Sequence, residues 1–299
     1  MVAPPSREID VNVCVCTFRR PSLEQSLRSI AAQLGAPSFD ITVADNDDAP
    51  TAEGLVRRVG AELGISIHYV HAPARNISIA RNACLAAGSA GFVAFLDDDE
   101  TADAGWLAAL WATLSEAQAD VVFGPVRAAY PQDAPAWATQ ADLHSVQPVV
   151  RSDGKIATGY TCNVMMRRKT IGALQFDPQF GRSGGEDTWF FHQLFSHGAT
   201  LAFSPNAWVS EPTSASRLRL GWLLQRSFRA GQSHGHILST RGGGRLSQIV
   251  SAASKAAYCG VDAALGVAAP TRWRKALVRG ALHAGVIARL VGIRDLQLY

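Results

Sequence analysis

Residues 91–100 read GFVAFLDDDE, an apolar and β-prone run that is followed directly by four acidic side chains. Consecutive carboxylates at the end of a buried strand repel one another at neutral pH unless donors or a cation offset the repulsion. Asp97, Asp98 and Asp99 therefore predict a divalent metal site, and oxygen ligands favour Mg²⁺ or Mn²⁺. A solvated acidic loop that caps a helix is the alternative interpretation.

Three similar apolar runs precede this one. We expect strands at residues 11–17, 39–44, 65–70 and 91–96, with helices between them, and a further strand at residues 120–126. The alternation predicts an α/β fold with a mostly parallel central sheet and helices on both faces. Ligands of such sheets bind beyond the carboxyl ends of the strands. The polar residues after the first, second and fourth strands are therefore expected to share one crevice.

A second acidic motif, Gly184-Gly185-Glu186-Asp187, stands before an apolar helix at residues 188–196. The two glycines allow a tight turn or a close approach to a ligand. Acids at the start of a helix also suit the helix dipole, which is the alternative explanation for this pair. A carboxylate held by a rigid helix is suited to act as a general base on a hydroxyl group.

Asp45 and Asn46 follow the second strand, and Arg75 and Arg81 lie just beyond the third. A carboxylate there can accept hydrogen bonds from a base or a ribose, and arginines can hold diphosphate oxygens by forked hydrogen bonds. Surface ion pairing would also explain either arginine. The sequence carries no phosphate-binding P-loop and no dinucleotide fingerprint, which argues against nucleotide hydrolases and dinucleotide oxidoreductases.

Taken in order, the motifs VCTFRRP, ADND, ARNISIARN, FLDDDE and GGEDTWFFHQL resemble glycosyltransferase family 2, which has the GT-A fold. The resemblance covers residues 11–211 and is strongest to bacterial enzymes of succinoglycan-type exopolysaccharide assembly. It implies that Asp99 coordinates the metal, that Asp97 lies near the ribose and belongs to the metal site, and that Asp187, beside Glu186, is the catalytic base. It also implies that residues 158–163 line the site. Together with the residues singled out above, the residues that we expect to bind the nucleotide-sugar are Thr17, Phe18, Arg20, Asp45, Asn46, Arg75, Arg81, Asp97 and Asp98.

The resemblance implies an inverting, metal-dependent hexosyltransferase. Its donor would be a nucleotide-diphosphate sugar such as a UDP-hexose, and its acceptor a saccharide or lipid-linked saccharide of cell-surface or exopolysaccharide synthesis. Residues 225–229, QRSFR, only approximate the Q-x-x-R-W motif of processive synthases, so a processive polysaccharide synthase is not expected. Two alternatives are a sugar nucleotidyltransferase and a non-catalytic scaffold that keeps the fold at a membrane assembly.

Charge divides the chain into an acidic body and a basic end. Residues 1–216 carry 15 Lys+Arg and 23 Asp+Glu, whereas residues 217–299 carry 13 Lys+Arg and two acids, which gives net charges of −8 and +11. We expect a catalytic domain at residues 1–216, with a nucleotide-sugar half at about 1–100 and an acceptor half at about 101–216. A basic helical region, with a glycine-rich break at Gly242–Gly244, is expected at residues 217–299.

Within the basic end, residues 271–294 combine six arginine and lysine side chains with apolar residues at helical spacing. Such a helix is typical of an anionic membrane interface and is too charged to span a bilayer. A helix packed on the catalytic domain is the alternative, and no recognition motif favours nucleic acid. The N-terminal MVAPPSREID lacks a secretory signal pattern, and five cysteines without a C-x-x-C predict free thiols. We therefore expect a cytoplasmic protein, peripheral on the inner face of the cell membrane.

Overall fold

The computed structural model describes residues 9–240 and 244–297. Most of the N-terminal segment and the glycines at 242 and 243 lie outside the described residues. The chain forms two compact units. The first contains residues 1–127, 147–181 and 190–211, and the second contains residues 128–146, 182–189 and 212–299.

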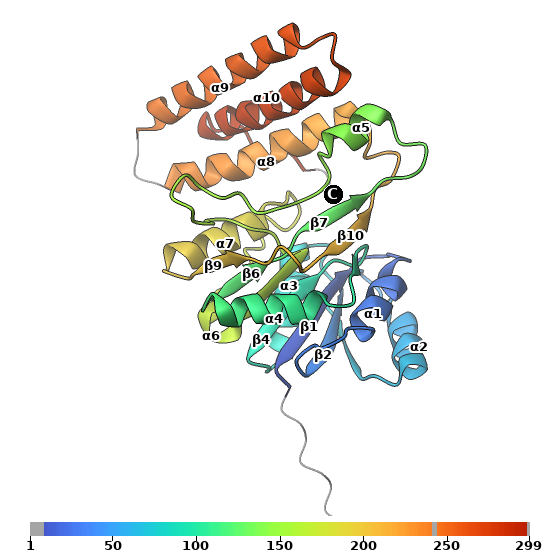
Figure 1. Ribbon diagram of the computed structural model, residues 1–299. Helices are drawn as coiled ribbons and strands as arrows, with labels where there is room; N and C mark the ends of the chain where they lie inside the picture. The colour runs from blue at the N-terminus through green and yellow to red at the C-terminus, as the bar shows by residue number, and fades with distance from the viewer. Residues whose placement is uncertain (1–8, 241–243, 298–299) are drawn as a thin grey trace, which may run out of the picture. The chain divides into compact units, whose positions relative to one another are not determined.

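The first unit is built on a seven-stranded sheet with the order β3-β2-β1-β4-β8-β6-β9 (Figure 1). Its strands are β1 (Val11–Thr17), β2 (Phe39–Asp45), β3 (Ile67–His71), β4 (Phe92–Leu96), β6 (Val121–Phe123), β8 (Asn163–Arg167) and β9 (Leu201–Phe203). Strand β8 runs antiparallel to both of its neighbours, and the other pairs are parallel. The expected mostly parallel α/β sheet is confirmed. Its interior strand β1 is buried along its whole length, as a run without polar alternation requires.

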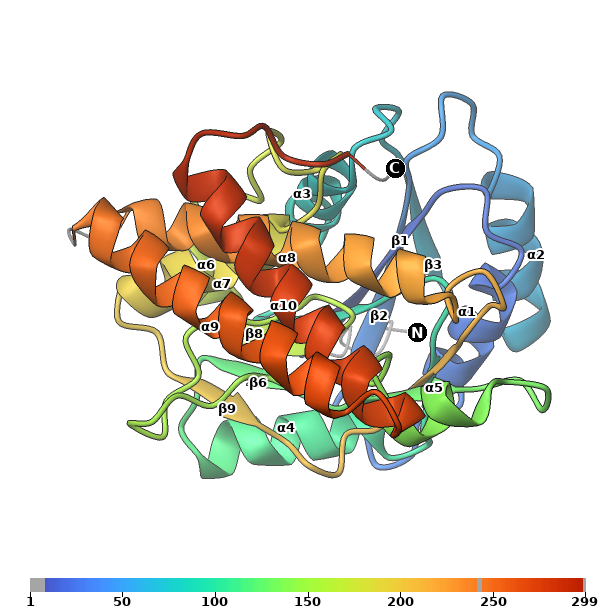
Figure 2. The same ribbon diagram turned by 90° about the horizontal axis from the view of Figure 1, so that it is seen from above.

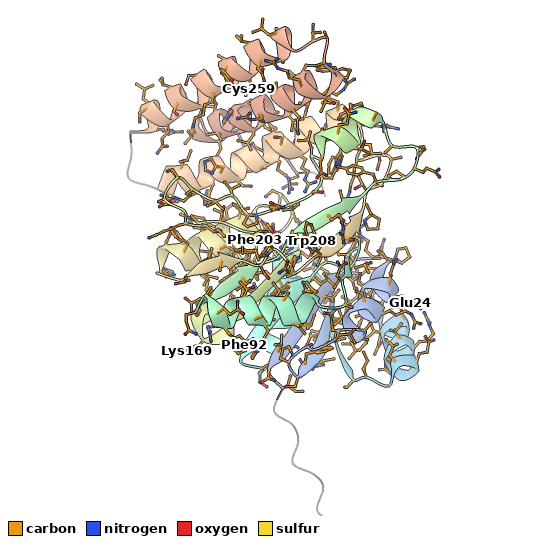
Figure 3. The ribbon with its side chains drawn as sticks, viewed as in Figure 1. Glu24, Phe92, Lys169, Phe203, Trp208 and Cys259 are labelled. Carbon is orange, nitrogen blue, oxygen red and sulfur yellow. The ribbon has the colours of Figure 1, made fainter. Side chains whose placement is uncertain are left out.

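Helices cover the sheet of the first unit. They are α1 (Leu23–Ala31), α2 (Glu53–Leu63), α3 (Ile77–Ala87), α4 (Trp106–Glu116) and the short α6 (Arg168–Ile171). Helices α3 and α4 lie on opposite faces of the sheet, as the two views show (Figures 1 and 2). Phe92 of β4 packs edge-on against Trp111 of α4, with ring centroids 4.7 Å apart (Figure 3).

The strand that we predicted at residues 120–126 is two strands in different sheets. Strand β6 belongs to the large sheet, whereas β7 (Val126–Ala129) joins β5 (Thr101–Ala102) and β10 (Val209–Pro212) in a three-stranded sheet. The partner changes at the intervening residues. The Gly124 N–H donates to the Asn163 carbonyl of β8, but the Pro125 carbonyl accepts from Val209 of β10. Proline has no N–H to continue the first ladder, so the strand ends there.

Gly159 is required by close packing in the core of the first unit. A Cβ at this position would lie 2.1 Å from the ring of Phe123, which is fully buried. Gly159→Ala is therefore expected to lower the free energy of unfolding by about 1–3 kcal/mol, the usual effect of overpacking. Urea denaturation checks the result. The control Gly54→Ala lies in an open part of α2 and should raise stability slightly, so equal stability of the two variants would contradict the expectation.

The second unit is helical. It contains α5 (Ala136–Ala141), the first turn of α7 (Glu186–Ser196), α8 (Leu220–Thr240), α9 (Arg245–Leu265) and α10 (Pro270–Leu290). Helix α10 lies between α8 and α9 (Figures 1 and 2). Among the described residues, none of the helices combines the length and apolar character that crossing a bilayer requires.

The five cysteines are free thiols, as expected. Four are buried, and Cys162 is partly buried. The sulfur atoms of Cys16 and Cys84 lie 3.9 Å apart in the core of the first unit.

Candidate active site

The strand register gathers the predicted crevice residues of the first unit at one edge of the sheet. Thr17 at the end of β1 is the register partner of Asp45 at the end of β2, and Cys14 pairs with Phe95 in β4. Because these strands are parallel, the loops that follow them leave the sheet on the same side. Asp97, Asp98 and Asp99 come directly after β4 and therefore share this edge with residues 17–20 and 45–48.

The carboxylates after β4 are part of a larger acidic cluster. Burial raises the pKa of Asp97 to about 7; Arg81 opposes the shift, and Asp99, Asp98 and Glu211 add to it. Burial raises the pKa of Asp98 to about 6. The pKa of Glu100, which is 1% exposed, is raised well above its usual value by burial and then by Asp97 and Glu211. In this buried environment the carboxylates are stable when they are protonated or when a bound cation offsets their negative charge.

The donor atoms of this cluster fit a divalent cation. One ligand atom from each of Asp97, Glu100 and Cys162 lies within 4.8 Å of the others. The two carboxylates suit Mg²⁺ or Mn²⁺, whereas a thiol is a softer ligand that these ions favour less. Among the residues that the structure describes, this group does not contain Asp99. The Glu100 side chain also accepts a hydrogen bond of 3.0 Å from the Asp97 N–H, which fixes the two acids relative to each other.

Two arginines that we predicted as nucleotide-sugar ligands face these acids. Arg81 on α3 is 6% exposed, and its guanidinium lies 5.6 Å from the ring centroid of Phe176. Arg20 is half-exposed and lies 3.8 Å from an oxygen of Asp98 and 3.5 Å from an oxygen of Asp99. The structure thus brings Arg20, Arg81 and the acidic run together.

Asp45 is buried and already occupied in this structure. Its carboxylate accepts hydrogen bonds from the N–H groups of Asp47 and Ala52 and from the Tyr69 hydroxyl, at 3.1, 2.8 and 2.7 Å. These bonds hold the loop that follows β2 against β3. The predicted contact between Asp45 and a nucleotide base remains a prediction.

Asn46 joins the loop after β2 to the turn before α3. Its side chain accepts a hydrogen bond of 3.0 Å from the Asn76 N–H, and its backbone carbonyl accepts one from Arg75 at 3.2 Å. Arg75 has a left-handed backbone, with φ at +46°, and pairs with Asp48. The turn therefore places Arg75 at the same edge of the sheet, with its side chain exposed.

The loop after β1 presents an aromatic ring and a fixed turn. Phe18 is 40% exposed, and the Arg19 guanidinium lies 5.2 Å from its ring centroid. Arg19 adopts φ of +55° and binds Asp47 through two hydrogen bonds of 2.7 and 2.8 Å. The Arg19 guanidinium lowers the pKa of Asp47 to about 2. Phe18 offers a flat apolar surface of the kind on which bases stack.

Residues 158–163, which were expected to line the site, divide into two roles. Cys162 faces the acidic cluster, as its place in the candidate metal group shows. Asn163 is fully buried and structural: its side chain accepts from the Trp106 indole at 2.8 Å and donates to the carbonyls of Pro125 and Ala207. The Tyr160 hydroxyl likewise donates to the Gly124 carbonyl at 2.7 Å.

Glu186 and Asp187 belong to the second unit, where they begin α7. Asp187 is partly exposed and accepts a hydrogen bond of 2.6 Å from the Thr188 N–H, and Glu186 is 5% exposed. Acids in the first turn also suit the helix dipole, as the alternative reading of this motif expected.

The two glycines before this pair serve packing against α8. Gly184 and Gly185 have φ of +81° and +90°, and a Cβ would lie 1.5 Å from the Arg229 side chain or 2.1 Å from that of Ser233. Arg229, at the end of the QRSFR stretch, donates to the Ser183 carbonyl at 2.6 Å. The QRSFR stretch thus fixes the turn that presents Glu186 and Asp187.

Sequence reasoning missed three members of the acidic cluster. Glu100 was predicted only as the end of the acidic run and Cys162 only as part of the segment that lines the site. Neither was predicted as a candidate metal ligand. Glu211, on β10, stands far from the other acids in the sequence and carries no motif of its own. Its position between Ser210 and Pro212 in a short strand was the one available signal.

The raised pKa values predict a pH dependence of stability. Free aspartates titrate near pH 4, so between about pH 4 and pH 7 Asp97 and Asp98 bind more protons in the folded chain than in the unfolded chain. The contribution of these two groups to the free energy of unfolding of the metal-free protein should therefore fall as pH rises through this window. Urea denaturation in EDTA at several pH values across this window measures how steeply the free energy of unfolding changes with pH. Asp97→Asn should make its fall with rising pH less steep. An unchanged slope in that variant would contradict the expectation.

The fold and the acidic site define the class of protein. The fold is that of the GT-A glycosyltransferases, a sheet whose strand ends carry an aspartate-rich loop. The sequence profile of glycosyl transferase family 2 matches residues 12–174. The chain belongs to this family and is a glycosyltransferase.

Relatives extend the match beyond the family profile. The chain is 43% identical to the succinoglycan biosynthesis protein ExoM of Rhizobium meliloti (strain 1021), over 99% of this chain and 97% of that protein. It is 23% identical to glycosyltransferase AglE of Haloferax volcanii, over 71% of this chain and 68% of that protein.

Solved structures share the fold at low sequence identity. Mannosyltransferase PcManGT from Pyrobaculum calidifontis, in complex with GDP-Man and Mn²⁺, aligns with a TM-score of 0.61 at 17% identity, over 95% of this chain and 89% of that one. S. aureus TarS 1–349 in complex with UDP-GlcNAc aligns with a TM-score of 0.55 at 14% identity, over 91% and 90% of the two chains.

Proposed function

We propose that this glycosyltransferase transfers a hexose from a nucleotide-diphosphate sugar to a saccharide or lipid-linked saccharide during exopolysaccharide synthesis. The observation that carries the proposal is the acidic cluster at the strand ends of the family 2 domain. The 43% identity to ExoM over nearly the whole chain supports the exopolysaccharide role. UDP is the nucleoside diphosphate that we favour as the sugar carrier, and neighbours of this fold were solved with both UDP- and GDP-sugars.

Donor binding is assigned to the edge of the sheet that carries the polar loops. Phe18 would stack on the base, with Thr17, Asp45 and Asn46 around the base and ribose. Arg20, Arg75 and Arg81 would hold the diphosphate, because guanidinium groups match paired phosphate oxygens. Arg20 lies near Asp98 and Asp99 at distances longer than a good hydrogen bond, which favours an exchange to phosphate.

Asp97 and Glu100 are the residues best suited to hold the divalent cation, with Asp99 as the further ligand that the family resemblance implies. When bound, Mg²⁺ or Mn²⁺ supplies positive charge that offsets the negative charge developing on the leaving diphosphate. Asp97 and Glu100 need such a partner to ionise together at neutral pH, because burial raises the pKa of both side chains.

Asp187 is proposed as the general base. It would remove the proton from the acceptor hydroxyl while the hydroxyl oxygen forms a bond to the anomeric carbon. The bond between that carbon and the diphosphate breaks, and its electron pair leaves with the nucleoside diphosphate. Attack on the face opposite the leaving group inverts the configuration. Glu186, beside Asp187 at the start of α7, would add negative charge next to the base.

The functional division we propose is a catalytic domain at residues 1–216 and a basic helical region at residues 217–299. The compact units divide the chain at other positions, because they group segments by packing and not by chemistry. We propose that the basic region attaches the enzyme to anionic lipid on the cytoplasmic face of the cell membrane. Attachment would bring the enzyme to a lipid-linked acceptor.

Nucleoside diphosphate release tests the function. The purified chain is incubated with UDP-, GDP- and dTDP-sugars in Mn²⁺ or Mg²⁺, with a lipid extract as acceptor source, and then in EDTA. We expect metal-dependent release from one donor. Pyrophosphate release from a nucleoside triphosphate and a sugar phosphate would instead show a nucleotidyltransferase. Absence of both nucleotide binding and release would show a non-catalytic scaffold.

A further inference from the structure

Helix α9 is apolar on the side that faces its own unit. Ala252, Cys259 and Ala263 are buried at intervals of seven and four residues. Cys259 lies on the side of α9 toward α10 (Figure 3), and a Cβ at Gly280 of α10 would be 3.3 Å from its Cβ. This face is therefore fully used for packing within the second unit.

The opposite side of α9 is also apolar, although solvent reaches it. Five large side chains there are between 58% and 75% exposed: Leu246, Val250, Tyr258, Val261 and Leu265. Their spacings of four, eight, three and four residues place them on one helix face. We call these five residues the outer stripe. Ser247 and Ser254 lie on the same face, so the stripe is interrupted by small polar side chains. Solvent-facing helix sides normally carry few large apolar side chains, so five of them on one face mark an interaction surface.

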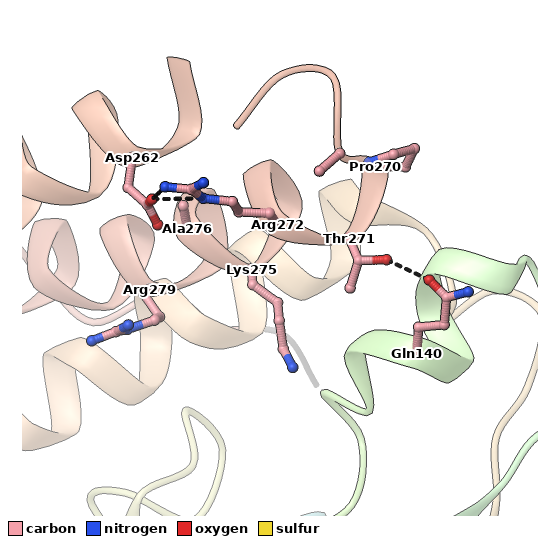
Figure 4. A pocket seen from close by; sticks show the side chains of 9 residues that line it. Gln140, Asp262, Pro270, Thr271, Arg272, Lys275, Ala276 and Arg279 are labelled. Carbon is pink, nitrogen blue, oxygen red and sulfur yellow. Dashed lines mark hydrogen bonds and ion pairs between the residues drawn. The ribbon is translucent and has the colours of Figure 1, made fainter. Parts of the chain in front are cut away.

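A basic groove adjoins the outer stripe at Val261, which precedes the groove residue Asp262 in α9. A cavity of about 550 Å³ opens between α9 and α10, and Asp262, Arg272, Lys275 and Arg279 are among its lining residues (Figure 4). Asp262 is neutralised by two hydrogen bonds of 2.7 and 3.0 Å from Arg272. Lys275 and Arg279 have no ion-pair partner within the described parts of the chain. The groove therefore carries net positive charge.

Further cations surround the groove. Burial, Lys255 and Arg279 lower the pKa of His283, so positive groups from α9 and α10 crowd the same surface. The sequence from residue 217 onward carries a net charge of +11. The occupant of this surface must therefore present apolar groups to the outer stripe and negative charge to the groove.

We propose that the outer stripe of α9 and the adjoining basic groove form a docking surface for a lipid bilayer that contains anionic phospholipids. The stripe enters the acyl boundary, and Lys275 and Arg279 contact phosphate groups of the lipids, as interfacial helices do. This inference rests on one part of the proposed function, the attachment to a membrane. It does not depend on the proposed sugar-transfer reaction. It moves the attachment from the helix at residues 271–294 to α9.

The structure explains why α10 does not provide this surface. We predicted that its apolar residues form a membrane-facing side. Instead α10 is packed between α8 and α9, and its buried residues are Ala276, Val278, Gly285, Val286, Ala288 and Leu290. Three of its cations, Arg272, Lys275 and Arg279, line the groove instead.

A second copy of the chain fits the surface less well than a bilayer. In a two-fold dimer the same patch meets itself, so Lys255, Lys275 and Arg279 of one copy would face cations of the other. An anionic membrane has the opposite charge and an apolar interior, so it matches both parts of the surface.

Vesicle flotation of the full chain tests the proposal. Vesicles of phosphatidylcholine, with and without phosphatidylglycerol, separate apolar from electrostatic binding. We expect the chain to float with the anionic vesicles. The variant Val250→Gln/Val261→Gln/Leu265→Gln should bind at least about tenfold more weakly, and Lys275→Gln/Arg279→Gln about 25-fold more weakly to anionic vesicles. The control Val149→Gln/Val150→Gln changes exposed apolar residues of the first unit and should float like the unaltered chain.

The outcomes separate docking from catalysis. All substituted positions are exposed, and circular dichroism verifies that the variants fold. Flotation of the stripe variant at the level of the unaltered chain overturns the proposal. So does a lipid-free dimer that the stripe substitutions convert to a monomer. Nucleotide release is measured on the same proteins, so a chain that floats but never releases nucleotide supports docking and counts against the proposed function alone.

Discussion

Asp187→Asn is expected to reduce turnover by about 10²–10⁴-fold, the contribution typical of a general base. Asparagine keeps the size of the side chain and can still accept the hydrogen bond from the Thr188 N–H. Only the capacity to take a proton is lost, so donor binding should stay near its original strength. Steady-state release of nucleoside diphosphate in the presence of acceptor, together with donor titration, measures the two effects separately.

A matched control for this substitution is Asp133→Asn, an exposed aspartate of the same compact unit. It should leave turnover unchanged. Glu186→Gln provides the second comparison, because it alters the neighbouring acid at the start of α7. A folded Asp187→Asn protein that keeps near-full transfer, while Glu186→Gln loses it, would move the role of base to Glu186.

Asp97→Ala should abolish metal-stimulated nucleotide release, with a loss of about 10³-fold. The substitution leaves Glu100 and Cys162 as an incomplete ligand set, because their ligand atoms form the candidate group only together with Asp97. It also removes a carboxylate that is costly to ionise in the metal-free protein. We therefore expect the folded state in EDTA to be at least as stable as that of the unaltered chain.

Titration with Mn²⁺, followed by turnover and by thermal unfolding, measures both effects of Asp97→Ala. Asp153→Asn is the control, since Asp153 is exposed and pairs with Arg151 at the surface of the same unit. Full metal-stimulated release by the Asp97→Ala protein would show that Asp99 carries the metal without Asp97.

Much of the sheet could be predicted from local sequence. The run VNVCVCT has no polar alternation, which is typical of a strand buried on both faces, and β1 has the predicted limits. The acids after β4 and the polar loops after β1 and β2 follow from the same rule of parallel sheets, that ligands bind at the carboxyl ends of strands. Their common edge needed no long-range information beyond the order of strands and helices.

Other features of the site depend on contacts between distant segments. Asp45 was read as an open acceptor, but Ala52 and Tyr69 fill its hydrogen-bonding positions. Glu211 joins Asp97 and Glu100 because β10 returns to pair with β5, more than 100 residues away in the sequence. Neither the burial of a carboxylate nor its partners can be read from its neighbours in the chain.

In the basic region at residues 217–299, too, some features follow from local sequence and others depend on tertiary contacts. Its charge and helical character were determined by the sequence alone, because both are properties of local composition and periodicity. Which helix keeps an apolar face for a partner was decided by tertiary structure. Helices α9 and α10 both have apolar sides, but α10 packs between α8 and α9, whereas α9 packs mainly against α10. A helix that packs on one side only keeps its other apolar side exposed. Whether that helix is α9 or α10 is determined by how the three helices α8, α9 and α10 pack.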